Sequence, residues 1–158
     1  LYITGHSQGS VMTYNVALLC PELVAAACGN DGIVYRAKID GEIKDDIVMP
    51  FMLNIGDQDR HFIEGGGNYG QVPDIVAEWC ARYGIDSSAS EFHYSNGKNY
   101  GTDYRNAQGI VVVREQWNQD KIHAMVPDDT YTIYDFLSNY SRGEDGVSYY
   151  MGVAIELK

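Results

Sequence analysis

The chain has 158 residues, of which 45% are hydrophobic and 21% charged, a balance that fits one globular domain with a real core. Its net charge of −11 and the lack of a basic patch argue against nucleic acid as a partner, and no apolar run approaches the ~18 residues of a membrane span. The three cysteines, Cys20, Cys28 and Cys80, do not resemble a disulfide framework, so we expect buried thiols, with a Cys20–Cys28 bridge as the less favoured alternative.

Strand-like and helix-like segments alternate along the chain, a pattern typical of an α/β fold with a mostly parallel sheet and flanking helices. The expected strands are short apolar runs, and they cover residues 1–4, 23–28, 47–55 and 109–117. The helix expected over residues 10–20 is apolar on nearly every side, which predicts burial against the sheet. Two further helices with one apolar face are expected to begin at Pro73 and Pro127 and to end at Gly84 and Gly143.

Three other segments carry turn or strand signals. Gly29-Asn30-Asp31-Gly32 indicates a turn, and Asn96-Gly97 within residues 91–104 predicts a hairpin. Residues 147–158 are apolar enough for an added strand, to which the sequence assigns no place. We therefore expect one α/β domain over residues 1–142 and a tail over residues 143–158.

Gly5-His6-Ser7-Gln8-Gly9 is the most informative stretch of the chain. It follows an apolar strand and leads into a helix, which is the context of a nucleophile elbow. Glycines on both sides make so tight a turn sterically possible. The turn would place the Ser7 hydroxyl at a helix N-terminus, where free N–H groups favour a developing negative charge. Ser7 is therefore the candidate nucleophile, and the alternative is a glycine-rich strand–helix turn with an incidental serine.

A serine hydroxyl is a weak nucleophile and needs a base, for which the chain offers four histidines. His123 follows the last expected strand, and in this fold class the loops at the carboxyl ends of strands carry the site. The other three histidines are expected to play other parts: packing or a pocket wall for His6, a place beside the acid for His61, and the surface for His93. His123 is therefore the expected base.

The acid that orients the histidine is sought among loop aspartates. Asp57 and Asp59 both follow the strand expected over residues 47–55, at its carboxyl end. Aspartates in such loops are often only turn formers. The order serine, aspartate, histidine is nevertheless the chain order of α/β-hydrolases.

An oxyanion hole needs two N–H donors. One is expected from the backbone of Gln8, directly after the nucleophile, whereas the other normally comes from a loop upstream of the elbow, which this chain lacks.

Asp120, Asp128 and Asp129 match no standard metal site, and the last two suit helix capping. Gly65-Gly66-Gly67 lacks the lysine of a phosphate loop. We therefore expect no metal and no cofactor.

Together these residues resemble the esterase family of polyhydroxybutyrate depolymerases and carbohydrate esterase family 1 feruloyl and acetylxylan esterases. The elbow and its helix, with the Met12-Thr13 pair, look like that family's elbow. Residues 20–26 resemble its Tyr-Pro-Asp-x-Phe-Ala-Ala stretch, and Gly56-Asp57-Gln58-Asp59 is similar to its Gly-Thr-x-Asp, which places the acid on Asp59. His123 stands where the family's catalytic histidine precedes a proline and the last helix.

The resemblance covers residues 1–142 and departs from the family at two places. Ile55 stands where histidine is common before Gly56. Lys121-Ile122 and Ala124-Met125 replace the glycines and tryptophan usual around the catalytic histidine. The family's N-terminal half has no counterpart, and the chain opens inside an apparent core strand. We therefore expect upstream sequence, with the missing N-terminal half of the same domain as a partner of residues 1–142.

The resemblance implies the C-terminal part of an α/β-hydrolase that acts as a carboxylic ester hydrolase, with Ser7, Asp59 and His123 as its catalytic triad. The implied partner is a small-molecule or polymer ester: feruloyl or acetyl esters of plant polysaccharide, or polyhydroxyalkanoate. No nucleic acid or membrane is implied as a partner, and the implied location is extracellular. Five aromatic residues lie in or beside loops that could approach the site and bind sugar rings or aryl acids, with packing of the loops as the alternative: Tyr69, Tyr94, Tyr100, Tyr104 and Trp117.

Two other functions stay open at this point. A serine peptidase or thioesterase would use the same elbow and triad on the same scaffold. A non-catalytic fragment or binding module would keep the scaffold without the chemistry.

Overall fold

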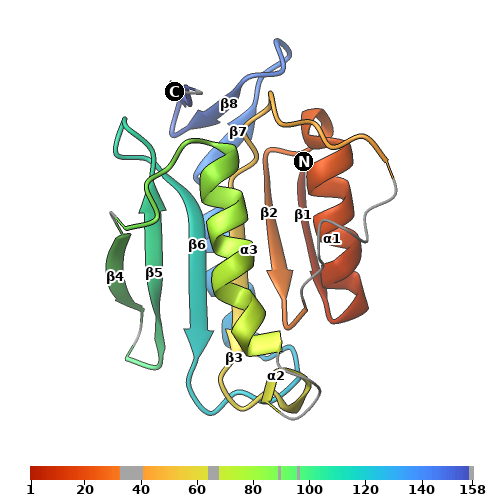
Figure 1. Ribbon diagram of the computed structural model, residues 1–158, viewed down its shortest axis with the longest axis vertical. Coiled ribbons are helices and arrows are strands. Elements are labelled where there is room, and N and C mark those ends of the chain that lie inside the picture. The colour runs from red at the N-terminus through yellow and green to blue at the C-terminus, as the bar shows by residue number, and fades with distance from the viewer. Residues whose placement is uncertain (33–40, 64–67, 89, 96, 157–158) are drawn as a thin grey trace.

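The computed structural model describes residues 1–32, 41–63, 68–88, 90–95 and 97–156, with side chains left out at 62–63, 68–70 and 90–95. Figure 1 shows one layered α/β unit with a central sheet. No helix in these ranges has both the length and the apolarity needed to cross a lipid bilayer.

Six strands form the central sheet in the order β1–β2–β3–β6–β5–β4. Their bounds are Tyr2–His6 (β1), Ala26–Asn30 (β2), Phe51–Gly56 (β3), Ser90–Ser95 (β4), Asn99–Arg105 (β5) and Val111–Asn118 (β6). The strands β1, β2, β3 and β6 pair in parallel, whereas β5 is antiparallel to both of its neighbours. Five of the six strands therefore share one direction, and the expectation of a mostly parallel α/β sheet is confirmed.

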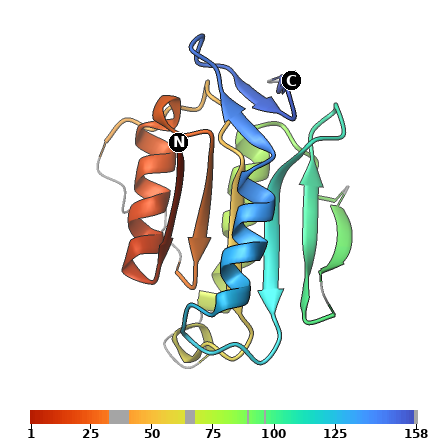
Figure 2. The same cartoon turned by 180° about the vertical axis from the view of Figure 1, so that it is seen from behind.

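Helices cover both faces of the sheet. On one face lie α1 (Gln8–Leu19) and α3 (Asn68–Arg82), joined by the contact of Tyr14 with Trp79 at 6.3 Å between ring centroids. Figure 2 shows α4 (Pro127–Leu137) on the opposite face. The short helices η1 (Pro21–Leu23) and α2 (Arg60–Ile63) lie in connections. The core between these layers is apolar, and Trp79 stacks on Phe51 of β3 at 4.5 Å.

Three local expectations are wrong. Helix α3 begins at Asn68, so Pro73 lies inside it, and the complete burial of Val72 holds this helical turn in place despite the proline. Helix α4 ends at Leu137 and not at Gly143, because Tyr140 packs its ring against the core in a following strand. The turn expected over residues 29–32 begins later, since β2 continues through Asn30.

Helix α1 is less buried than its composition predicts. Its side chains at Ser10, Thr13, Tyr14, Ala17 and Leu18 are buried. Met12 is 60% exposed, so the helix is covered on one side only. All three cysteines are free thiols, and Cys20 is only half-buried.

A second, three-stranded sheet has the order β7–β8–β9, covering Tyr140–Arg142, Ser148–Tyr150 and Val153–Ala154. The tail expected from residue 143 supplies β8 and β9, whereas β7 belongs to the expected domain. The Arg142 guanidinium donates to the carbonyl oxygens of Val24 and Val48 at 2.9 and 3.0 Å. These contacts fix the small sheet near the amino ends of β2 and β3, so the carboxyl ends of the strands stay open at the other end of the molecule.

Candidate active site

Ser7 occupies a strained turn between β1 and α1. Its backbone has φ 57° and ψ −115°, a conformation that costs a non-glycine residue free energy and that persists only when the surroundings impose it. The Ser7 N–H donates to the carbonyl oxygen of Asn30 at 2.9 Å, and the Ser7 carbonyl accepts from the N–H of Ser10 at 3.0 Å. The turn is thus held by β2 on one side and by α1 on the other.

The two glycines of the motif differ in what they contribute. A Cβ at Gly5 would lie 2.3 Å from the carbonyl oxygen of Gly9, which no side chain tolerates. A Cβ at Gly9 would meet nothing within 4 Å, so the expectation that both glycines are sterically required is wrong for Gly9. A third glycine, Gly32, matters instead, because its Cβ would lie 2.4 Å from the Ser7 carbonyl oxygen.

His123 and Asp59 meet as a pair. Nδ1 of His123 lies 2.7 Å from Oδ2 of Asp59, and Asp59 is fully buried. The other carboxylate oxygen of Asp59 accepts a hydrogen bond from the backbone N–H of His61 at 2.9 Å. Since both oxygens are engaged, the carboxylate is fixed in place and orients the imidazole, leaving Nε2 of His123 for other partners.

Asp57 takes no part in this pair. Its carboxylate accepts the N–H of Asp120 at 2.8 Å, near the surface, where it ties the β3 loop to the β6 loop. Of the two aspartates that the sequence left as candidates for the acid, only Asp59 contacts His123 in the structure.

Three histidine rings form a cluster at this edge of the sheet. The ring of His123 lies 4.6 Å from that of His6 and 4.4 Å from that of His61, measured between centroids. His6 is more than a pocket wall, because its Nε2 also lies 3.5 Å from Oδ2 of Asp31. Burial lowers the pKa of His6, an effect that the Asp31 carboxylate opposes. The side chain of His93 lies outside the described residues.

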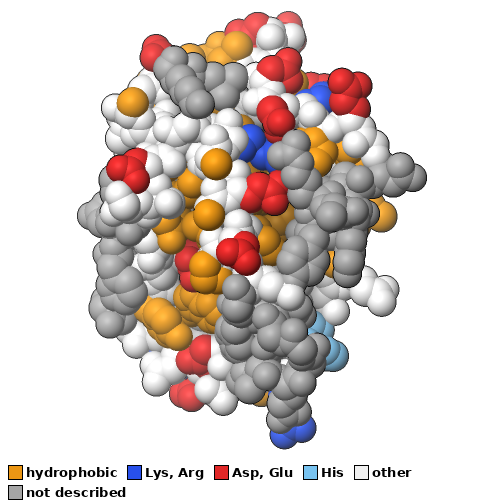
Figure 3. Space-filling model, viewed as in Figure 1, with side chains coloured by type: hydrophobic (Ala, Val, Ile, Leu, Met, Phe, Trp, Pro, Cys, Tyr) orange, Lys and Arg blue, Asp and Glu red, His pale blue; other side chains and the backbone are white. Residues whose placement is uncertain are grey.

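Ser7 lies at the same edge of the sheet as this cluster, directly after His6. No hydrogen bond joins its hydroxyl to His123, although the structure describes both side chains. The connection between the two candidates runs through His6, which precedes Ser7 and whose ring contacts that of His123. Catalytic hydrogen bonds often tighten only when substrate is bound. Figure 3 shows histidine side chains reaching the surface at the lower right of that view.

The backbone N–H of Gln8 lies in the first turn of α1, where N–H groups have no acceptor within the helix. Beside His123 is an open hollow of about 340 Å³, lined by Gln58, Arg60, His61, Ile122 and His123. The space for a ligand therefore lies next to the imidazole, and neither Ser7 nor Gln8 is among the described residues that line it.

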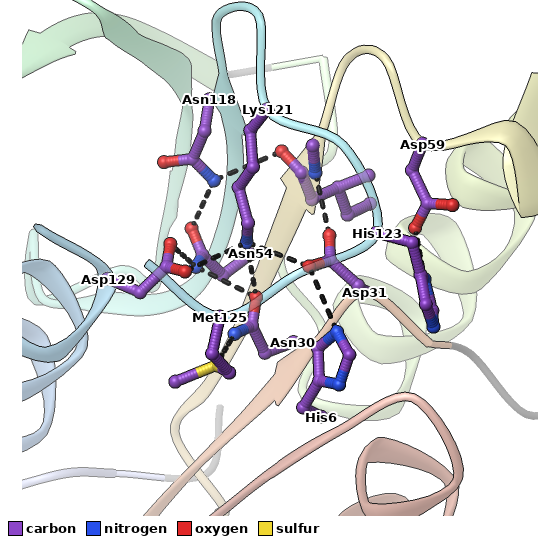
Figure 4. Close-up of polar contacts among 12 residues, drawn as sticks. His6, Asn30, Asp31, Asn54, Asp59, Asn118, Lys121, His123, Met125 and Asp129 are labelled. Atoms are coloured by element: carbon purple, nitrogen blue, oxygen red, sulfur yellow. Dashed lines mark hydrogen bonds and ion pairs between the residues drawn. The ribbon is translucent and has the colours of Figure 1, made fainter. Parts of the chain in front are cut away.

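A buried polar network beneath the histidines was not predicted from the sequence. Its centre is the Lys121 ammonium, with Nζ 2.9 Å from Oδ2 of Asp31, 3.1 Å from Oδ2 of Asp129 and 2.8 Å from Oδ1 of Asn30 (Figure 4). Asn54 joins it by donating to Asn30 at 3.0 Å and to Asp129 at 2.9 Å. The available signal was a set of polar residues at the carboxyl ends of otherwise apolar strands.

The remaining sequence candidates contribute less. Asp129 caps α4 by accepting the Val126 N–H at 2.8 Å, and within the described ranges no group of three potential ligands could hold a metal ion. Tyr104 is buried, and its hydroxyl donates to Glu115 at 3.3 Å, so it packs the sheet. The side chains of Tyr69 and Tyr94 fall outside the described residues, as does the segment 65–67.

Neither a scan against models of known protein families nor a search of curated proteins found a match to this chain. The family resemblance therefore rests on the residues and motifs quoted above.

Proposed function

We propose that the protein is a serine hydrolase of the α/β-hydrolase fold that cleaves carboxylic esters. The observation that carries this proposal is the strained Ser7 turn, which stands at the same sheet edge as the His123–Asp59 pair. Strain in a non-glycine residue is expected where function requires it. A histidine held by a buried carboxylate is the arrangement that turns a serine into a nucleophile.

The proposed reaction runs through an acyl-enzyme. Nε2 of His123 takes the Ser7 proton as Oγ attacks the ester carbonyl carbon, and the Gln8 N–H donates to the oxyanion that forms. The protonated imidazole then gives its proton to the departing alkoxide, which leaves as the alcohol. Water, deprotonated by His123, attacks the acyl carbon, and the bond from that carbon to Ser7 Oγ breaks. The imidazolium returns the proton to Oγ, which releases the acid and restores the Ser7 hydroxyl and neutral His123.

A substrate panel with a matched variant tests this proposal. The protein, in the form its cell produces, is assayed with methyl ferulate, acetylated xylan, a hydroxybutyrate oligomer and a peptide amide. We expect turnover of at least one ester, none of the amide, and loss of all turnover in Ser7→Ala. Preferential cleavage of the amide would favour a peptidase, and ester turnover that survives Ser7→Ala would remove Ser7 as the nucleophile.

A further inference from the structure

We propose that Lys121 is a positioning residue, whose buried ammonium holds the His123 loop against the Ser7 turn. This inference rests on the proposed function for its kinetic consequence. Lys121 touches neither Ser7 nor the imidazole in the contacts described, so it would act through the groups that it binds.

The Lys121 ammonium is buried among carboxylates. The Lys121 side chain is 3% exposed, and its two carboxylate partners, Asp31 and Asp129, are 0% and 1% exposed. Figure 4 shows the side chain reaching from the β6 loop into the space between the ends of β2 and β3 and the start of α4. A buried charge persists only when it is paired and hydrogen-bonded, so these elements are tied to one point.

The His123 loop is anchored on both sides of the histidine. Two residues before it, the Lys121 carbonyl accepts the Gln58 N–H at 2.9 Å, which binds the loop to the segment carrying Asp59. Two residues after it, the Met125 sulfur contacts the Asn30 side-chain amide. The imidazole thus lies between two anchored residues, Lys121 and Met125, whose side chains both contact the Asn30 side chain.

The network around Lys121 also contacts the Ser7 turn. Asn30, whose side-chain oxygen binds the Lys121 ammonium, accepts the Ser7 N–H with its backbone carbonyl at 2.9 Å. Asp31, which directly follows β2 and also binds the Lys121 ammonium, lies 3.5 Å from Nε2 of His6. The end of β2 is therefore shared: it fixes the backbone of Ser7 on one side and the Lys121 side chain on the other.

The test compares Lys121→Met with Lys44→Met. Lys44 forms an exposed ion pair with Glu22 at 2.8 Å, outside the site, and supplies the matched loss of one ammonium. Because misplacement of a catalytic group by about 1 Å can cost about 100-fold in rate, we expect kcat of Lys121→Met to fall about 100-fold. Its KM should stay within about two-fold, since the lost interaction orients the catalytic groups and does not bind substrate. Lys44→Met should keep both constants.

A second variant covers failure of the first to fold. Lys121→Met combined with Asp31→Asn removes one cation and one carboxylate, so the charge of the Lys121, Asp31 and Asp129 set stays at −1 (+1 −1 −1 before, −1 after). The folded double variant should also show the kcat defect, because the anchor is gone. Wild-type kcat in either folded variant would overturn the proposal.

A spectroscopic readout separates this proposal from that of ester hydrolysis. We expect the proton held between His123 Nδ1 and Asp59 at 2.7 Å to give a downfield proton resonance, whose observation requires no turnover. We expect this resonance to shift or broaden in Lys121→Met and to stay unchanged in Lys44→Met. If wild-type protein hydrolyses no ester, the proposed function fails, and an unchanged resonance in folded Lys121→Met would independently overturn the positioning role.

Discussion

His123 Nδ1 and Asp59 Oδ2 lie 2.7 Å apart, although 64 positions separate the two residues in the chain. They meet because β3 and β6 are parallel neighbours, so the loops that follow them leave the same edge of the sheet. The backbone bond from the Gln58 N–H to the Lys121 carbonyl holds these loops together. The contact between His123 and Asp59 therefore depends on β3 and β6 being neighbours in the sheet.

Asp59→Asn should lower kcat by roughly 10⁴-fold with little loss of stability, because an asparagine no longer holds the imidazole in the tautomer that can accept the serine proton. Asp57→Asn is the matched control, since it removes a charge two residues away whose carboxylate binds only the Asp120 N–H among the described contacts. Steady-state kinetics on both variants checks this. Equal losses in the two variants would contradict the assignment of Asp59 as the orienting acid.

Gly5→Ala and Gly9→Ala should have opposite effects on stability. The new methyl at Gly5 would lie 2.3 Å from the Gly9 carbonyl oxygen, so we expect the free energy of unfolding to drop by about 1–3 kcal/mol. The new methyl at Gly9 enters open space within a helix, where alanine is favoured by up to ~1 kcal/mol. Urea denaturation measures both, and a stable Gly5→Ala variant would show that the turn relaxes easily.

Lys121→Met should destabilise the fold by roughly 3–5 kcal/mol, because it leaves buried carboxylates without their cation. Burial already raises the pKa of Asp31, while Lys121 is the largest opposing influence. Lys44→Met removes a partly exposed ion pair, which solvent screens, and should cost much less than Lys121→Met. The comparison is made by chemical denaturation at neutral pH. A cost at Lys121 no larger than that at Lys44 would mean that water or a rearrangement compensates the buried carboxylates.

The stability of the protein should fall as the pH drops below the ordinary histidine value, and His6 should contribute to this fall. Burial lowers the pKa of His6 from 6.5, against the pull of Asp31 and Asp59 and together with repulsion from His123 and Lys121. Below pH 6.5 the unfolded chain therefore binds a proton at this position more readily than the folded chain, and stability declines toward the lower folded pKa. Unfolding free energies of wild type and His6→Asn across this interval test the sign. A parallel decline in both proteins would remove His6 as a contributor.

Much of the sheet could be predicted from the sequence because buried parallel strands are short apolar runs. The runs around Phe51 and Val112 are such cases. Pro127 marks the start of α4, because proline suits the first helical position, and Gly84 follows the end of α3 with a positive φ that glycine adopts without strain. The start of α3 could not be predicted, since Pro73 is a strong local signal for a helix start that the burial of Val72 overrides. Tertiary packing decided the boundary.

The site was predictable only in part. Ser7 stands in a local motif, and Asp59 and His123 follow strands, so position along the chain was informative. Lys121 gave no such signal, because its role depends on Asp31, which lies far from it in the sequence, and on Asp129, which follows it closely but meets its ammonium only when α4 packs on the sheet. Contacts of that kind are set by strand order and by the docking of α4, which single-sequence patterns do not encode.

The central claim is that Ser7 is a nucleophile activated by His123. An organophosphonate fluoride tests it directly, because an activated serine oxygen attacks phosphorus and expels fluoride, leaving a covalent adduct that mass spectrometry assigns to one residue. We predict a single adduct on Ser7 in the wild-type protein, greatly slowed labelling in His123→Ala, and none in Ser7→Ala. Labelling at another residue, or labelling of Ser7 at an unchanged rate in His123→Ala, would contradict this account.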